Sequence, residues 1–73
     1  MDIMVQGRDA RGEWGASSWH ATPILALDAA LRITAQGVPA RITEWTDTGR
    51  RYTRLPAGAV DAPATYWKRI WRQ

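Results

Sequence analysis

The chain has 73 residues, no cysteine and a net charge of +3 at pH 7. A chain of this length forms one domain, and it buries only about 60% of the surface that its unfolded state exposes, so its stability is small. The lack of cysteine excludes disulfide bonds and thiolate metal sites and is typical of a reducing compartment. No apolar stretch approaches the roughly 20 residues that span a bilayer, and no signal-peptide pattern is visible, so we expect a cytoplasmic protein without a membrane partner.

The first predicted elements are a strand and a turn. Apolar residues alternate weakly over Ile3–Gln6, which places Ile3 and Val5 on one face. Residues 7–12 read Gly-Arg-Asp-Ala-Arg-Gly, and this density of glycine and aspartate is typical of a turn. We therefore expect a first strand that ends near Gln6, where the chain reverses.

Glu13–Ala21 is predicted to be a second strand with an interruption. Trp14 and Trp19 have opposite parity, so they do not share a face of an unbroken strand. A bulge near Gly15, or a break at Ser17–Ser18, would bring both rings to the same face.

The clearest predicted element is a helix over Thr22–Gln36. Thr22 is a good N-cap, and Pro23 fits the first helical position, where no backbone N–H is needed. Gly37 follows the helix, where a left-handed residue closes the last turn, and Pro39 prevents continuation. The start and stop signals therefore agree on one central helix.

This helix has one apolar side. At about 3.6 residues per turn, that side contains Ile24, Leu27, Ala30, Leu31 and Thr34, with Ile33 and Ala35 at its borders, and the other side contains Leu25, Asp28, Arg32 and Gln36. Asp28 and Arg32 are four residues apart and are expected to form a surface ion pair worth roughly 0.3 kcal/mol. A one-sided helix needs a sheet or another helix to cover it.

Residues 40–46 and 50–55 are predicted to form a hairpin. A turn at Thr48–Gly49 pairs Ile42 with Leu55, and the alternative is a three-residue turn that ends in a glycine bulge. The first register directs Ala40, Ile42, Thr53 and Leu55 towards the helix and Arg41, Thr43, Trp45, Tyr52 and Arg54 to the far face.

The last part of the chain is predicted to be a linker and a short helix. Residues 56–63 read Pro-Ala-Gly-Ala-Val-Asp-Ala-Pro, a composition typical of a linker. Asp61 is the expected cap of a helix that begins at Ala62. Its apolar side contains Tyr66, Trp67, Ile70 and Trp71, and its other side contains Lys68, Arg69 and Arg72.

Together these elements predict a single α+β domain over residues 1–73. The order is strand, strand, helix, strand, strand, helix, which gives a four-stranded antiparallel sheet packed on one central helix, ββαββ, with a short C-terminal helix. The sheet and the central helix take up residues 1–55, the linker 56–61 and the C-terminal helix 62–73.

The positive charge belongs to the second half of the chain. Residues 1–37 carry three arginines against four acidic residues, whereas residues 38–73 carry six arginines and one lysine against three acidic residues. This distribution indicates an acidic partner, either nucleic acid or an acidic protein surface. The alternative is ordinary surface charge without a specific partner.

The far face of the sheet is the first candidate binding surface. Its residues are Arg41, Trp45, Tyr52 and Arg54, with Arg50 and Arg51 as further candidates. Aromatic rings stack on bases and guanidinium groups contact phosphates, and the same residue types anchor protein interfaces. The alternatives are that Trp45 and Tyr52 are only a stabilising cross-strand pair, or that the C-terminal helix covers this face.

The C-terminal helix is the second candidate, through Trp67, Arg69 and Trp71. Basic, aromatic amphipathic helices bind membranes, acidic grooves or nucleic acid. At two to three turns this helix is too short to be stable alone. It therefore packs on its own sheet, or on a partner, which includes a second copy of the chain held by the two tryptophans.

The sequence indicates no chemical site. His20 is the only histidine and lies beside Ser17 and Ser18, but a nucleophile–base pair needs a third orienting group and an oxyanion site, which no pattern signals. One histidine and no cysteine also argue against a transition-metal site. We therefore expect no catalytic residue, no cofactor and no metal.

The run Ile3–Trp14, followed by the helix and by Arg41–Trp45, resembles a pattern of small phage and prophage proteins. In that pattern a short hairpin leads into one helix and then into a returning hairpin. Anti-CRISPR proteins are similar in size and layout, and the resemblance covers residues 3–55. It implies a non-enzymatic inhibitor, acting in a bacterial host cell, that binds a type I CRISPR surveillance complex and blocks recognition of target DNA.

Two functions are therefore expected from the sequence. The first is a small inhibitor of mobile-element origin that binds a protein complex, as the resemblance implies. The second is a nucleic-acid-binding module that uses the arginines and aromatic residues of the sheet face. Both are compatible with a monomer or a homodimer.

Overall fold

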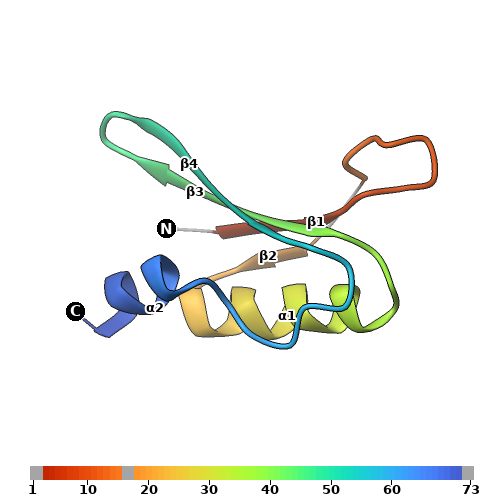
Figure 1. Ribbon diagram of the computed structural model, residues 1–73. Coiled ribbons are helices and arrows are strands. Elements are labelled where there is room, and N and C mark those ends of the chain that lie inside the picture. The colour runs from red at the N-terminus through yellow and green to blue at the C-terminus, as the bar shows by residue number, and fades with distance from the viewer. Residues whose placement is uncertain (1–2, 16–17, 72–73) are drawn as a thin grey trace.

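The computed structural model describes residues 3–15 and 18–71. Its elements are β1 (Ile3–Gly7), β2 (Ser18–His20), α1 (Pro23–Ala35), β3 (Ala40–Thr46), β4 (Gly49–Leu55) and α2 (Ala64–Trp71). The strands form one antiparallel sheet in the order β2-β1-β3-β4. Both helices lie on the same side of this sheet (Figure 1). The predicted α+β fold and its order of elements are confirmed.

The central helix α1 begins and ends where its capping residues predict. The Thr22 side chain accepts a hydrogen bond from the Leu25 backbone N–H at 3.3 Å, and Pro23 occupies the first turn. At the other end Gly37 has φ 83°, the left-handed conformation that glycine adopts most readily. The terminal signals in the sequence were therefore sufficient to place this helix.

The buried side of α1 differs in part from the predicted one. Leu27, Ala30 and Thr34 are buried as expected, but Ile24 is 49% exposed and Ala26 is fully buried. The prediction was that the large apolar residues of this helix would pack against the sheet. Two of the four buried residues of α1, Ala26 and Ala30, are alanines, whose small side chains allow the helix to lie close to the sheet.

The strand β2 is much shorter than the predicted strand over residues 13–21. It has three residues, and Trp14 forms only an isolated bridge with Arg8. Ala16 and Ser17 lie outside the described residues, so the predicted interruption between Trp14 and Trp19 stays a prediction.

The register of the β3–β4 hairpin corrects the prediction by two residues. Asp47 and Thr48 form the turn, and Ile42 lies opposite Thr53 rather than Leu55. The bulged alternative is not observed either, because the pairing is continuous from the turn. A shift of two residues keeps the parity of every side chain, so Ile42, Thr53 and Leu55 are buried towards the helices as predicted.

The conformation of the turn explains this register. The Thr46 hydroxyl donates to the Gly49 carbonyl at 2.9 Å, which ties the last residue of β3 to the first residue of β4. Gly49 has φ 135°, and no other described residue around the turn has a positive φ. The positive φ angle therefore occurs at a glycine, just after the two-residue turn.

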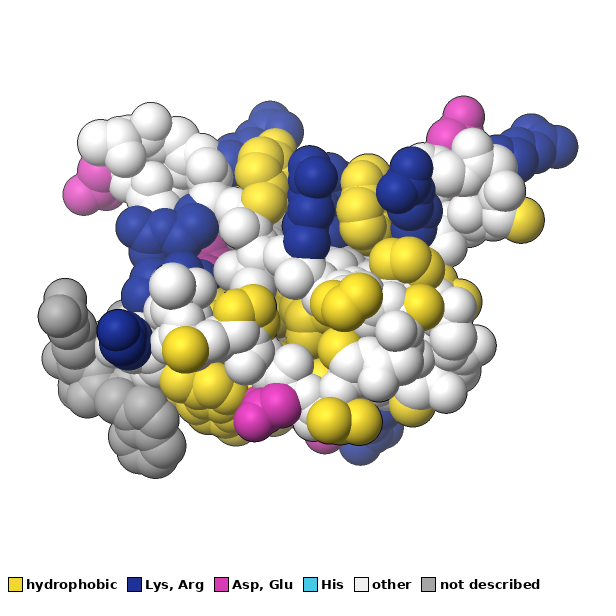
Figure 2. Space-filling view, in the orientation of Figure 1, with side chains coloured by type: hydrophobic (Ala, Val, Ile, Leu, Met, Phe, Trp, Pro, Cys, Tyr) yellow, Lys and Arg dark blue, Asp and Glu magenta, His cyan; other side chains and the backbone are white. Residues whose placement is uncertain are grey.

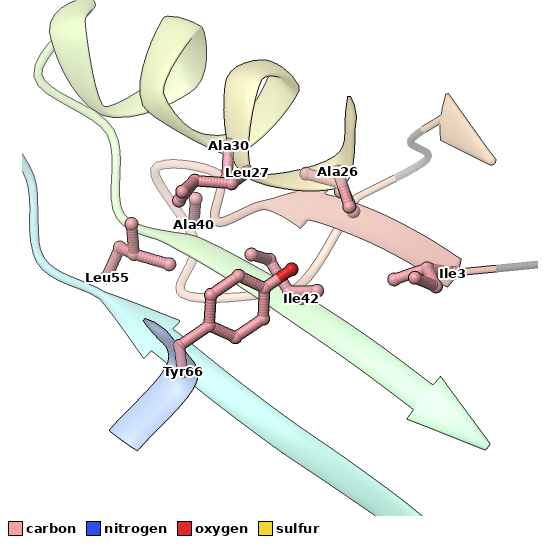
Figure 3. Close-up of a cluster of buried hydrophobic side chains, with 9 residues drawn as sticks. Ile3, Ala26, Leu27, Ala30, Ala40, Ile42, Leu55 and Tyr66 are labelled. Atoms are coloured by element: carbon pink, nitrogen blue, oxygen red, sulfur yellow. The ribbon is translucent and has the colours of Figure 1, made fainter. Parts of the chain in front are cut away.

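The core lies between the sheet and the helices, as Figure 3 shows. Its buried residues are Ile3, Val5, Ala26, Leu27, Ala30, Ala40, Ile42, Leu55 and Tyr66. Tyr66 comes from α2 and is 1% exposed, so the C-terminal helix completes the core of its own chain. Its hydroxyl donates to the Pro23 carbonyl at 2.8 Å, which links α2 to the first turn of α1.

The helix α2 begins two residues later than predicted, and Asp61 is not its cap. Asp61 lies three residues before the helix, where its carboxylate accepts hydrogen bonds from the Ala62 N–H and the Trp67 indole N–H, both at 2.8 Å. The first turn of α2 bonds instead to the Pro63 carbonyl. Asp61 therefore stabilises the loop against the helix without capping it. Neither described helix has the length and apolar character needed to cross a membrane.

An ion pair adds a second link between α2 and the sheet. The Arg69 guanidinium donates to the Glu44 carboxylate at 2.9 Å and to the Thr53 hydroxyl at 3.1 Å. It also lies 5.1 Å from the Tyr66 ring centre. These contacts hold α2 on the side of the sheet that α1 covers.

The Tyr66 hydroxyl makes the stability of the fold sensitive to high pH. Burial raises its pKa above the ordinary value of 10.0, the Glu44 carboxylate adds to the rise, and Arg69 opposes it. The folded state therefore keeps this proton to a higher pH than the unfolded state does. The resulting stabilisation is complete below about pH 10 and is lost as the pH rises further.

We expect Tyr66→Phe to remove this pH dependence. At pH 7 the variant loses about 1 to 2 kcal/mol of unfolding free energy, because the Pro23 carbonyl loses its hydrogen-bond donor. Urea denaturation of both proteins between pH 7 and pH 11 measures the difference. The expectation fails if the wild type and the variant lose stability equally steeply above pH 10.

Candidate functional site

The side of the sheet opposite the helices carries a row of arginine and aromatic side chains. Because successive side chains of a strand alternate, the residues next to those that pack on the helices point to this open side. We name this surface the Arg–aromatic face, and its members are Arg8, Trp14, Trp19, Arg41, Trp45, Arg50, Tyr52 and Arg54. Figure 2 shows it in profile along the upper edge of the molecule, where basic and hydrophobic side chains alternate.

Arg41 is the centre of one group of contacts on this face. Its guanidinium carbon lies 4.6 Å from the Trp14 ring centre and 5.0 Å from the Tyr52 ring centre. One of its nitrogens donates to the Gln6 side-chain carbonyl at 2.6 Å. Arg8 extends the group, 5.9 Å from the Trp14 ring centre. Each such cation–π contact is worth about 0.5–1 kcal/mol at an exposed site, so Arg41 is held in one orientation.

A second group lies nearer the hairpin turn. The rings of Trp19 and Trp45 stack with their centres 5.5 Å apart and their planes at 23°. The Arg50 guanidinium carbon lies 5.6 Å from the Trp45 ring centre. Trp19 remains 58% exposed, so this stack presents a flat apolar surface to solvent.

Two buried polar atoms on this face have no hydrogen-bond partner in the described structure. They are Nε of Arg41 and the hydroxyl oxygen of Thr43, which is 1% exposed and lies on the same face. A buried polar group without a partner costs about 1–3 kcal/mol. These two unpartnered groups offset part of the stabilisation that the ring contacts of the face provide.

No described carboxylate forms an ion pair with an arginine of the Arg–aromatic face. Asp9 accepts hydrogen bonds from turn amides, Asp28 pairs with Arg32 on α1, Glu44 pairs with Arg69, and Asp61 binds the α2 region. The four arginines of the face are thus not neutralised by a neighbouring carboxylate. Arg54 is exposed and makes no hydrogen bond, ion pair or ring contact with other described residues. The face is positively charged and has two kinds of recognition group, guanidinium and ring.

The structure brings together most of the predicted residues of the sheet face. Arg41, Trp45, Arg50, Tyr52 and Arg54 all lie on the Arg–aromatic face, and α2 does not cover it. Arg51 does not belong to it. That residue lies on the helix side of the sheet, opposite Glu44, where it lines a small hollow together with Arg69 and Ile70 of α2.

The predicted residues of α2 lie elsewhere. Trp67 is half-buried, packs against the core and donates to Asp61, and Arg69 is engaged with Glu44. The side chain of Trp71 lies outside the described part of the chain. The helix therefore packs on its own sheet, the first of the two arrangements considered.

Sequence reasoning did not assign Arg8, Trp14 or Trp19 to the binding face. The glycine and aspartate around Arg8 indicate a turn, although the parity that buries Ile3 and Val5 directs Arg8 to the opposite face. The two tryptophans were not assigned to either face because the path between them was unknown. Pairing with β1 resolves this, since Trp14 lies opposite Arg8 and Trp19 opposite Met4.

His20 is placed beside a hydroxyl but not in a catalytic arrangement. Its Nε2 lies 2.6 Å from the Ser18 hydroxyl oxygen, and both side chains lie at the surface. No carboxylate within the described residues is hydrogen-bonded to the ring, and no group of three potential metal ligands occurs there. The pair is a local contact along β2.

Comparison with protein-family models, with curated proteins and with solved structures finds no match for the chain. The assignment of function therefore depends on the chemistry of the Arg–aromatic face.

Proposed function

We propose that the chain is a non-enzymatic binding protein that holds nucleic acid on its Arg–aromatic face. The observation that carries this proposal is a sheet face with four arginines and four aromatic rings, on which no arginine forms an ion pair with a described carboxylate. Guanidinium groups match phosphate oxygens, and aromatic rings match the flat faces of bases. Nucleic acid is the polyanion that offers both partners in regular repetition.

The internal contacts of the face support this proposal because they prepare the arginines for binding. Arg41 lies against two rings and is bonded to Gln6, so its guanidinium is already ordered. Arg50 and Arg54 lie four residues apart on β4, which corresponds to roughly 13 Å along an extended strand. An ordered guanidinium loses less entropy on binding than a free one. An acidic protein surface would engage these charges but would leave the exposed rings without a specific partner.

Binding to labelled DNA at a series of salt concentrations tests the proposal. We expect the affinity for single- and double-stranded oligonucleotides to fall as salt is raised, because each neutralised phosphate releases counterions. Three to four contacts would give a logarithmic slope of about −3 on duplex DNA. Fluorescence anisotropy of the oligonucleotide measures the affinity, and quenching of tryptophan emission reports base stacking. An affinity that does not change with salt contradicts the proposal.

The second candidate is the inhibitor of a type I CRISPR surveillance complex that the resemblance implies. Its support from the structure is that exposed tryptophan, tyrosine and arginine residues dominate the binding energy of protein interfaces. A purified effector complex, incubated with saturating protein and then with target DNA, provides the test. Reduced target binding together with co-purification is the expected result, and unchanged target binding counts against this function.

A further inference from the structure

Within the described part of the chain, the strand β4 has no partner on one side of its backbone. It is the last strand of the sheet order, and the described pairing of β4 is with β3 alone. In an antiparallel pair, the backbone groups of alternate residues point to the partner strand and those between point away. A free edge of this kind can accept another strand.

Hydrogen bonds around β1 identify which groups of β4 are free. The Arg8 N–H donates towards β3, to the Pro39 carbonyl at 3.0 Å, whereas the Gly7 carbonyl accepts from Gly15 on the other side at 2.9 Å. Even-numbered residues of β1 therefore bond to β3. In the β1–β3 register, these residues lie opposite odd-numbered residues of β3, so the backbone N–H and carbonyl groups of those β3 residues point to β1. The backbone groups of the even-numbered residues of β3 therefore point to β4.

The free backbone groups of β4 consequently belong to Arg50, Tyr52 and Arg54. Their partners across the register are odd-numbered residues of β3, which bond to β1 instead. No other backbone hydrogen bond involves these three residues within the described ranges. The edge thus offers three N–H groups and three carbonyl groups in the spacing of a strand.

The charge of this edge selects its partner. Arg50, Arg51 and Arg54 are all exposed, and the carboxylate opposite Arg51, that of Glu44, is already paired with Arg69. A second copy of the chain is a poor partner, because antiparallel pairing centred on Tyr52 places Arg50 opposite Arg54 twice, and like charges directly opposite are destabilising. An acidic strand meets opposite charges at the same positions.

We infer that the β4 edge binds an extended acidic segment of a partner protein as a fifth strand of the sheet. The three free N–H groups and carbonyls of Arg50, Tyr52 and Arg54 supply the backbone pairing, and the arginines supply the selection for acidic side chains. This site shares Arg50, Tyr52 and Arg54 with the Arg–aromatic face, but it adds backbone pairing at the rim of the sheet, which nucleic-acid binding does not need.

Amide hydrogen exchange, measured by NMR on the intact chain, tests the inference. The probe is a capped ten-residue peptide of alternating threonine and glutamate, titrated to saturation with a dissociation constant expected below about 1 mM. We expect exchange at Arg50, Tyr52 and Arg54 to slow at least about tenfold, with little change at Arg51 and Thr53, which already bond to β3. A peptide with lysine in place of glutamate should give no protection.

A matched pair of variants separates backbone pairing from side-chain contact. Tyr52→Pro removes one outward-facing N–H, which an edge strand tolerates, whereas Tyr52→Ala keeps that donor and removes the same ring. The proline variant should bind the acidic peptide at least about tenfold more weakly than the alanine variant. As a second readout, a peptide that is N-methylated at alternate residues should not bind the wild type.

The inference is overturned by any of three results. These are no saturable binding of the acidic peptide, binding without protection of the three amides, or equal binding of the N-methylated peptide. DNA binding by the same samples is measured in parallel, so loss of one activity is distinguished from loss of the other.

Discussion

The double variant Arg50→Glu/Arg54→Glu should bind DNA at least about a hundredfold more weakly than the wild type. Each reversal removes a charge-assisted hydrogen bond to phosphate, worth about 1.5–3 kcal/mol, and adds a repulsive carboxylate. Arg54 has no partner among the described residues, and Arg50 contacts only the Trp45 ring, so the fold should be retained. Anisotropy titrations at fixed salt measure the effect, and circular dichroism checks the fold.

The matched control for this experiment is Arg32→Glu/Lys68→Glu. It changes the net charge by the same amount, but both residues are exposed on the helices, away from the Arg–aromatic face. Its DNA affinity should stay within about threefold of the wild type at moderate salt, where charges farther apart than the Debye length are screened. Equal weakening in both double variants would mean that net charge, and not this face, determines binding.

Ile42→Ala is expected to unfold much of the protein at physiological temperature. Ile42 is fully buried in the central strand β3, between the sheet neighbours Val5 and Thr53 and below the helices. Truncation of a buried isoleucine costs about 2–5 kcal/mol. A domain of this size has a total stability on the order of 5 kcal/mol, so most or all of it is lost.

Thermal and urea denaturation, followed by tryptophan fluorescence, measure this loss. Leu25→Ala is the control, because Leu25 is a similar apolar residue that is 53% exposed on α1, and its loss should change the unfolding free energy by no more than about 0.5 kcal/mol. If Ile42→Ala is no less stable than Leu25→Ala, the described core is wrong.

Local signals in the sequence were sufficient for the elements that they mark. Thr22, Pro23 and Gly37 place α1 within a residue at each end, because capping depends on neighbours along the chain. The faces of the hairpin were also predictable, since they depend on parity alone. The register was not, because Thr48–Gly49 resembles a turn whereas the structure uses Asp47–Thr48 and places Gly49 just after it.

Only part of the candidate site was predictable, because some of its residues lie far apart in the sequence. Arg41, Trp45 and Tyr52 belong to one hairpin, so their common face follows from alternation. Trp14 and Trp19 join them through pairing with β1, and no local pattern in the sequence fixes that pairing. The stacking of Trp14 against Arg41, twenty-seven positions later in the sequence, is a tertiary property.

At Asp61 a local pattern instead predicted a contact that the structure does not have. An aspartate just before an apparent helix is a good cap by sequence, but the helix begins at Ala64 and the carboxylate binds the Trp67 indole instead. Similarly, the larger side chain of Ile24 suggested burial, whereas Ala26 makes the contact. Both cases depend on how closely each helix approaches the sheet, and the amino-acid composition does not specify that distance.

The burial of Tyr66 in the core also has a consequence during translation. A nascent chain that has emerged only as far as Asp61 contains every residue of the sheet and of α1, but it lacks the tyrosine ring that packs in the core with Ile42 and Leu55. The domain therefore reaches its native packing only after residue 66 has left the ribosome. Until then, the incomplete intermediate exposes apolar surface that chaperones can recognise.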